Sequence, residues 1–168
     1  MVDLKKYNMG TILAISLSFL IAIFYFTPFL YNGLIGSQIS GYEMFLLMFE
    51  PTKATGVGAS LFNVYTEVGM QFSPLAYIVT ILSFLLFIVA IAIIIFGFVD
   101  MMGYRGNKKI VTYLCYSMVG IVALIMFLAM LRAETASNVN NGIEIGYGLI
   151  LSLIASVFLS LLRYLKIK

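Results

Sequence analysis

Cys115 is the first residue to consider for chemistry, because it is the only cysteine in a chain of 168 residues that has no His and no Trp. One cysteine cannot form an intramolecular disulfide, and structural zinc sites usually take four ligands, mostly Cys and His. Acid–base catalysis by His and haem ligation by His are excluded for the same reason. Because Cys115 lies within the apolar run YLCYSMVG, we expect a buried packing residue and not a nucleophile.

The remaining motifs carry little chemistry. The Gly-Val-Gly of residues 56–58 is not followed by Lys, so it does not indicate a phosphate-binding loop. The apolar stretches contain neither the Asp pair nor the Ser–Lys pair that intramembrane proteolysis would use. We therefore predict that the protein is not an enzyme and that it has no catalytic residues, no metal site and no cofactor.

The composition excludes a soluble protein. Hydrophobic residues make up 62% of the chain, charged residues 10%, and the mean hydropathy is +1.08. Soluble domains average about 45–50% apolar and about 25% charged residues, so these charges are too few for a soluble surface. A soluble enzyme, a nucleic-acid-binding protein and a disordered chain are all set aside.

Four uncharged stretches are each long enough to cross a bilayer as a helix, which takes about 20 apolar residues. They predict spans over residues 9–30, 75–98, 110–131 and 144–163. Residues 31–74 and 132–143 would form outer loops, and residues 99–109 an inner loop. The expected fold is a single all-α integral membrane domain, a four-transmembrane-helix bundle. The first stretch also resembles a signal peptide. It is longer than the apolar region of a typical signal peptide and has no A-x-A cleavage pattern, so we expect an uncleaved first span.

The charges predict the orientation. Eight of the ten Lys and Arg residues fall on one predicted side: Lys5, Lys6, Arg105, Lys108, Lys109, Arg163, Lys166 and Lys168. Because cationic loops stay in the cytoplasm, we expect both termini to be cytoplasmic in a multi-pass protein of the cell membrane. Arg132 is an exception on the outer side, and we expect it to pair with Glu134, Glu144 or Glu67.

Small residues recur every four positions in the first and last spans. These candidate packing residues are Gly10, Ala14, Ser18, Ala22, Gly148, Ser152, Ser156 and Ser160. Helices in lipid approach one another through small residues, so the two stripes predict close packing of these spans, with each other or with another copy. Chance spacing of common residues is the alternative.

The first outer loop is too apolar to be a simple connector. Residues 42–50 predict a short amphipathic helix lying on the bilayer, and the alternation over 61–72 predicts a strand. Together they would form a small extracytoplasmic cap, either a lid over the bundle or a docking surface. The candidate partner-contact residues are Tyr42, Phe45, Leu46, Phe49, Phe62, Val64 and Tyr65.

The arrangement of four spans, a long first outer loop with strand character and a short second loop resembles claudin-like four-span proteins. The Trp residues and the cysteine pair of the claudin first outer loop are missing, so the resemblance does not imply a junctional role. The phrases FTPFLYNG, ISGYEMF and GYGLILSLIAS are similar to small prokaryotic four-span proteins of unknown function.

Apart from Glu144 and Arg163 at the two ends of the last span, the spans contain no Asp, Glu, Lys, Arg or His, although such residues are typical of pumps and ion-coupled transporters. The sequence therefore favours a non-catalytic accessory or structural subunit, or a scaffold, that associates with other membrane proteins. A channel or carrier for a small neutral solute is the alternative, since Ser and Thr stripes could line a path. The expected partners are the lipid bilayer and other membrane proteins or copies of the chain, without nucleic acid.

Overall fold

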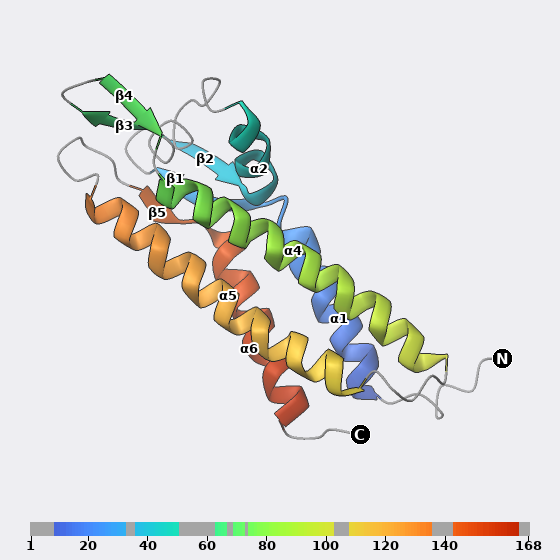
Figure 1. Ribbon diagram of the computed structural model, residues 1–168. Helices are drawn as coiled ribbons and strands as arrows, with labels where there is room; N and C mark the ends of the chain where they lie inside the picture. Colours follow the sequence, from blue (N-terminus) through green and yellow to red (C-terminus); the bar gives the residue numbers. More distant parts are fainter. Residues whose placement is uncertain are drawn as a thin grey trace.

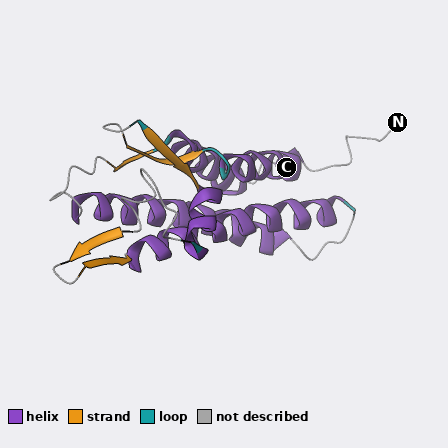
Figure 2. Ribbon diagram, turned by 90° about the horizontal axis from the view of Figure 1, so that it is seen from above, coloured by secondary structure: helices purple, strands orange, loops and turns teal. Residues whose placement is uncertain are grey.

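Four long helices dominate the computed structural model, which describes residues 9–32, 36–50, 63–66, 69–72, 74–102, 108–135 and 143–164. They are α1 (Met9–Phe24), α4 (Pro74–Met101), α5 (Lys108–Thr135) and α6 (Tyr147–Tyr164). Each packs against two neighbours, in the order α1–α4–α5–α6 and back to α1, so together they form a four-helix bundle (Figures 1 and 2).

The bundle has two different ends. Strands and a short helix cover one end, which we call the cap end; α1 begins and α6 ends at the other, which we call the terminal end (Figure 1). At the terminal end the Thr11 hydroxyl of α1 donates a hydrogen bond of 3.2 Å to Asp100 Oδ2 in the last turn of α4. The sequence placed Asp100 in an inner loop, but α4 continues to Met101.

Buried residues on the helices follow a spacing of alternately three and four positions. On α5 they are Val111, Cys115, Met118, Val122, Ile125 and Ala129. This average of 3.5 residues per turn keeps one seam facing the partner helices, as in left-handed coiled coils. On α1 the buried face therefore includes Thr11 and Ile21, and is wider than the predicted four-residue stripe.

The four helices differ in length. The stretches Pro74–Met101 and Lys109–Leu131 are each long and apolar enough to cross a membrane. The apolar helices α1 and α6 are shorter, with 16 and 18 residues. The mostly helical architecture agrees with the sequence.

The helix predicted for the first span ends six residues early, at Phe24. The amide of Thr27 donates to the Phe24 carbonyl at 3.0 Å, and the Thr27 hydroxyl donates to the same oxygen at 2.7 Å. Pro28 follows, and a proline disfavours helical backbone in the residue before it and has no N–H to continue the ladder. These contacts satisfy the helix end and release the chain into a strand.

That strand, β1 (Pro28–Asn32), belongs to a three-stranded antiparallel sheet that the sequence did not predict. Its partners are β2 (Ser37–Ser40) on one side and β5 (Ile143–Ile145) on the other, in the order β2-β1-β5. Leu30 is paired with Ile39 of β2 and with Ile145 of β5. The sheet therefore takes up the end of the predicted first span and the start of the predicted last span, whose helix begins only at Tyr147.

The strand predicted over 61–72 is instead a hairpin. Strand β3 (Asn63–Thr66) pairs with β4 (Gly69–Phe72) in antiparallel register, with Thr66 opposite Gly69. Folding back lets the two halves satisfy each other's backbone groups, which a single strand could not do alone. The alternating residues thus lie on two paired strands rather than on one.

The short helix predicted over 42–50 is present as α2 (Gly41–Phe49). Ser40 caps it: the Glu43 amide donates to Ser40 Oγ at 3.2 Å, and the Ser40 amide donates to Glu43 Oε2 at 2.7 Å. This reciprocal pair is a capping box, which satisfies two amides that a helix start leaves open. α2 packs against α4 at the cap end (Figure 1).

Candidate interaction surfaces

The helix pair α1 and α6 continues directly into the strand pair β1 and β5. At this junction the Gly146 amide donates a 2.7 Å hydrogen bond to the Phe29 carbonyl. A Cβ on Gly148 would lie 2.8 Å from the Pro28 carbonyl oxygen and 3.2 Å from that of Phe24. Only glycine leaves room for these backbone oxygens, so the first turn of α6 lies directly against the end of α1.

Most of the predicted packing residues are buried in this bundle, where α1 and α6 are in contact. Gly10, Ala14, Ser18, Ala22, Gly148, Ser152 and Ser156 are buried. Ser160 is only half-buried, and its hydroxyl donates a 3.0 Å hydrogen bond to the Cys115 carbonyl of α5. The last member of the α6 stripe therefore contacts the other neighbouring helix.

Hydroxyl groups within the bundle mostly bond to their own helix. Ser152 donates to the Gly148 carbonyl at 2.8 Å, Ser83 to the Val79 carbonyl at 2.8 Å and Thr80 to the Ala76 carbonyl at 2.9 Å. Such bonds hide the polarity of the side chain from its surroundings. These positions therefore present small, nearly apolar surfaces to the neighbouring helices.

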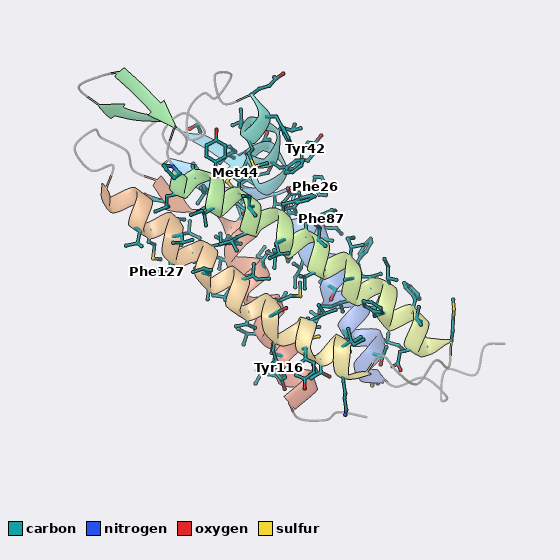
Figure 3. All side chains as sticks on the ribbon, in the orientation of Figure 1. Phe26, Tyr42, Met44, Phe87, Tyr116 and Phe127 are labelled. Atoms are coloured by element: carbon teal, nitrogen blue, oxygen red, sulfur yellow. The ribbon has the colours of Figure 1, made fainter. Side chains whose placement is uncertain are left out.

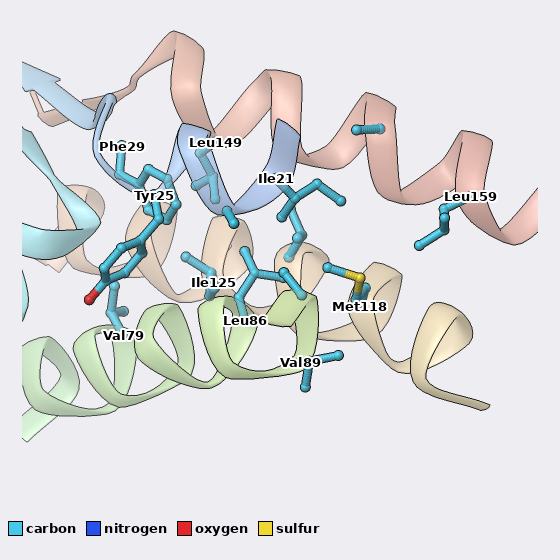
Figure 4. Close-up of a cluster of buried hydrophobic side chains, with 14 of the residues drawn as sticks. Ile21, Tyr25, Phe29, Val79, Leu86, Val89, Met118, Ile125, Leu149 and Leu159 are labelled. Carbon is cyan, nitrogen blue, oxygen red and sulfur yellow. The ribbon is translucent and has the colours of Figure 1, made fainter. Parts of the chain in front are cut away.

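Two buried hydroxyls have no hydrogen-bond partner in the part of the chain that the structure describes. They belong to Ser18, which is fully buried, and to Tyr25, which is 3% exposed. Leaving a buried polar group unpaired costs about 1–3 kcal/mol. Figure 4 shows the Tyr25 side chain reaching from the end of α1 toward Val79 of α4.

Stacked aromatic rings connect the end of α1 and helix α2 to α4. The Tyr25 ring stacks on Phe87 with centroids 4.8 Å apart, and the Phe45 ring stacks on Phe84 at 4.4 Å. Phe26 lies between them, with its ring 5.5 Å from Tyr42 and 5.9 Å from Phe87 (Figure 3). The cap is thereby fixed to the cap-end half of α4.

The predicted partner-contact residues of α2 divide between two surfaces. Phe45 is half-buried against α4, whereas Tyr42, Leu46 and Phe49 are 44%, 48% and 67% exposed. Their spacing of four and three positions puts these three on one helix face, which we call the α2 stripe. The side chains of the other three predicted residues, Phe62, Val64 and Tyr65, lie outside the described part.

The outward faces of the long helices are apolar. On α6 the exposed residues between 147 and 161 are Tyr147, Ile150, Leu151, Ile154, Val157, Phe158 and Leu161. On α4 the exposed residues between 75 and 99 are Ile78, Ile81, Leu85, Ile88, Ile91, Ile95 and Phe98. Tyr116 and Phe127 likewise point away from the bundle on α5 (Figure 3). In water, contiguous apolar surface of this extent would drive association.

Charged residues offer little for catalysis in the described ranges. No three His, Cys, Asp or Glu side chains group there as metal ligands would. Of the predicted orientation residues, only the Lys109 side chain is described, and it is exposed at the start of α5. Glu144 is exposed on β5 opposite Tyr31, while the Arg132 and Glu134 side chains lie outside the described part, so their pairing stays a prediction.

Comparison of the chain with protein-family models, with curated proteins and with solved structures finds no match in any of the three. The resemblance to claudin-like four-span proteins therefore stays a prediction.

Proposed function

We propose that the chain is a multi-pass protein of the cell membrane in which α1, α4, α5 and α6 all span the bilayer. Within it the protein acts as a non-catalytic accessory or structural subunit, or a scaffold, that associates with other membrane proteins through its helix faces and cap. One observation carries the proposal: the exposed residues of α4 and α6 are apolar along almost the whole of both helices. Lipid tails or apolar helices are the surroundings in which such a surface is stable.

The two shorter helices, α1 and α6, fit this proposal because a strand adjoins each of them at the cap end and lengthens the segment that could cross the bilayer. The 16 residues of α1 extend about 24 Å, against a hydrocarbon core of about 30 Å. β1 continues α1, and its backbone pairs with β2 and β5. Phe29 and Leu30 are almost fully buried there. Non-helical backbone at membrane depth is tolerated when protein encloses it in this way.

The charge distribution supports an orientation with both termini in the cytoplasm. In the sequence, the cationic segments precede α1, connect α4 to α5 and end the chain after α6, and this orientation assigns them to the cytoplasm and the cap to the outside. A cysteine introduced at Gln38, an exposed residue of β2, should react with a membrane-impermeant maleimide added to intact cells. Cys115 is buried and serves as the unreactive background. Reaction of Gln38→Cys only after permeabilisation would contradict the orientation.

The interior favours a subunit over a channel or carrier. Ile21, Leu86, Met118, Ile125 and Leu149 are each at most 1% exposed and point toward one another in the middle of the bundle (Figure 4). Large side chains thus fill the axis along which a path would run. The buried hydroxyls of Thr80, Ser83 and Ser152 are bonded to carbonyls of their own helices, so they are not available to a solute.

Photo-crosslinking in cells would test the association. A photoreactive residue at Ile88 of α4 and another at Ile154 of α6 report on two exposed faces, and one at the buried Leu86 is the matched control. A subunit should give a discrete protein adduct from at least one exposed position and none from Leu86. Lipid adducts alone from every exposed position, with solute flux in reconstituted vesicles, would contradict the subunit and favour the carrier.

A further inference from the structure

α2 has three distinct sides. Gly41 and Met44 are buried toward the bundle, and Glu43 and Glu50 are exposed. Between the acidic side and the side that carries Phe45 runs the α2 stripe of Tyr42, Leu46 and Phe49. A 100° step per residue places Glu43 next to the stripe, on the side away from Phe45, and Glu50 follows as the C-cap of α2. The helix therefore presents one apolar and one acidic side to its surroundings.

The depth of α2 follows from its contact with α4. Asp100 lies at the terminal end of α4, and Phe84, on which Phe45 stacks, precedes it by 16 residues. At 1.5 Å per residue, Phe84 lies about 24 Å from the level of Asp100. If the Asp100 carboxylate marks one boundary of a hydrocarbon core about 30 Å thick, Phe45 lies about 6 Å inside the opposite boundary.

Measured from the same level, α1 gives a similar depth. Thr11 is hydrogen-bonded to Asp100 and so lies at its level, and Tyr25 follows Thr11 by 14 residues. Tyr25 is therefore about 21 Å from that level, and its carbonyl accepts a 3.2 Å hydrogen bond from the Tyr42 amide at the start of α2. Both routes place α2 at the outer edge of the hydrocarbon.

We propose that α2 is an interfacial anchor whose α2 stripe inserts into the outer leaflet, with Glu43 and Glu50 directed to water. Interfacial helices bury their apolar face about 5–10 Å into the boundary between headgroups and acyl chains, which is the depth derived above. Tyr42 has the amphipathic ring that is enriched at this level. The exposed Phe26 ring contacts Tyr42 and continues the apolar surface toward α4 (Figure 3). The inference rests on the proposed membrane insertion, and it leaves the helix faces and the rest of the cap for protein partners.

The absence of Trp from the chain makes a direct test possible, because a single introduced Trp is the only indole reporter. Three variants of the full chain are reconstituted into phosphatidylcholine vesicles. Phe49→Trp reports on the α2 stripe and Ile88→Trp on the α4 face proposed to meet lipid. Gln38→Trp, on the exposed β2 position, is the matched cap control. Bromines are placed on the acyl chains either close to the headgroup or close to the bilayer centre.

We expect Phe49→Trp to lose most of its fluorescence with bromines close to the headgroup and little with bromines at the centre. Ile88→Trp should be quenched by either lipid or by the deeper one, and Gln38→Trp by neither. If Ile88→Trp is quenched but Phe49→Trp is not, the anchor is wrong while membrane insertion stands. An unquenched, blue-shifted Phe49→Trp would show that protein, such as a second copy, covers the stripe, which also overturns the anchor. Absence of quenching in all three variants would overturn the proposed membrane insertion itself.

Discussion

The two ends of the bundle are held by different kinds of interaction. At the cap end, β1 pairs with β5 through backbone hydrogen bonds and aromatic rings stack on α4. At the terminal end, two side-chain hydrogen bonds connect helices, from Thr11 to Asp100 and from Ser160 to the Cys115 carbonyl. The cap end thus joins α1 to α6 through its strands and to α4 through its aromatic rings, and the terminal end joins α1 to α4 and α5 to α6.

This difference shows how single changes should act at each end. The backbone hydrogen bonds of the sheet survive the loss of any side chain. The cap end should instead be sensitive to added side-chain volume where two backbone segments touch, as at Gly148. A side-chain hydrogen bond is lost with one atom, but in a membrane bundle it contributes on average only about 0.6 kcal/mol. We therefore expect large steric effects at the cap end and small polar effects at the terminal end.

The largest effect is expected for Gly148→Ala. The added Cβ would lie 2.8 Å from the Pro28 carbonyl oxygen, which is backbone and cannot rotate away. We expect a loss of about 2–3 kcal/mol of stability, at the upper part of the usual range for overpacking, measured by thermal unfolding in mild detergent. Gly120→Ala is the matched control, because nothing lies within 4 Å of its Cβ position. Equal stability of the two variants would contradict the close approach.

The second effect concerns the attachment of the cap to α4. Phe45→Ala removes the ring that stacks on Phe84, so we expect a loss of about 1–2 kcal/mol from buried area and ring pairing. Amide hydrogen exchange should accelerate in α2 while α5 and α6 keep their protection. Phe49→Ala serves as the control, because that ring is 67% exposed and should change little in detergent. Uniform acceleration in all helices would argue that the cap is not a separate unit.

The third effect is at the terminal end. Thr11→Val keeps the shape of the side chain but removes the donor to Asp100. We expect a loss of about 1 kcal/mol, within the range for interhelical hydrogen bonds in membranes. A double-mutant cycle with Asp100→Ala, which removes the acceptor, isolates the pair, measured by equilibrium unfolding in detergent. Strictly additive losses would show that the two side chains do not interact.

The smallest effect is expected for Ser160→Ala. Its hydroxyl crosses to the Cys115 carbonyl, so its loss should cost about 0.6 kcal/mol. The hydroxyl of Ser156 bonds within its own helix to the Leu153 carbonyl, so Ser156→Ala is the control and should be close to neutral in the same unfolding assay. A larger loss from Ser156→Ala would reverse the assignment of the interhelical contact.

The long helices were predictable because their signal is local. Uncharged runs and Pro74 as a first helical residue can each be recognised within a few residues. The sheet was not predictable in this way. β1 pairs with β5 across more than a hundred residues, and the three residues of β5 are too few for their alternation to indicate a strand.

The contact of Ser160 with α5 has a geometric origin. A step of four residues rotates a position by about 40° around the helix, so three steps from Gly148 to Ser160 rotate it by about 120°. The stripe therefore begins against α1 and ends against α5. Sequence spacing alone does not say where along a helix the neighbour changes. The packing of α6 with both neighbours supplies that information.

The pairing of β1 with β5 has a consequence for synthesis. β1 leaves the ribosome long before β5, and until then only β2, a few residues later in the chain, can satisfy one of its edges. The α1–β1 segment therefore stays half-paired while more than a hundred further residues are made. Such distant contacts form slowly, and exposed strand edges invite wrong pairing. Protection of this early hairpin by a chaperone or by the insertion machinery would then decide the yield of correctly closed protein.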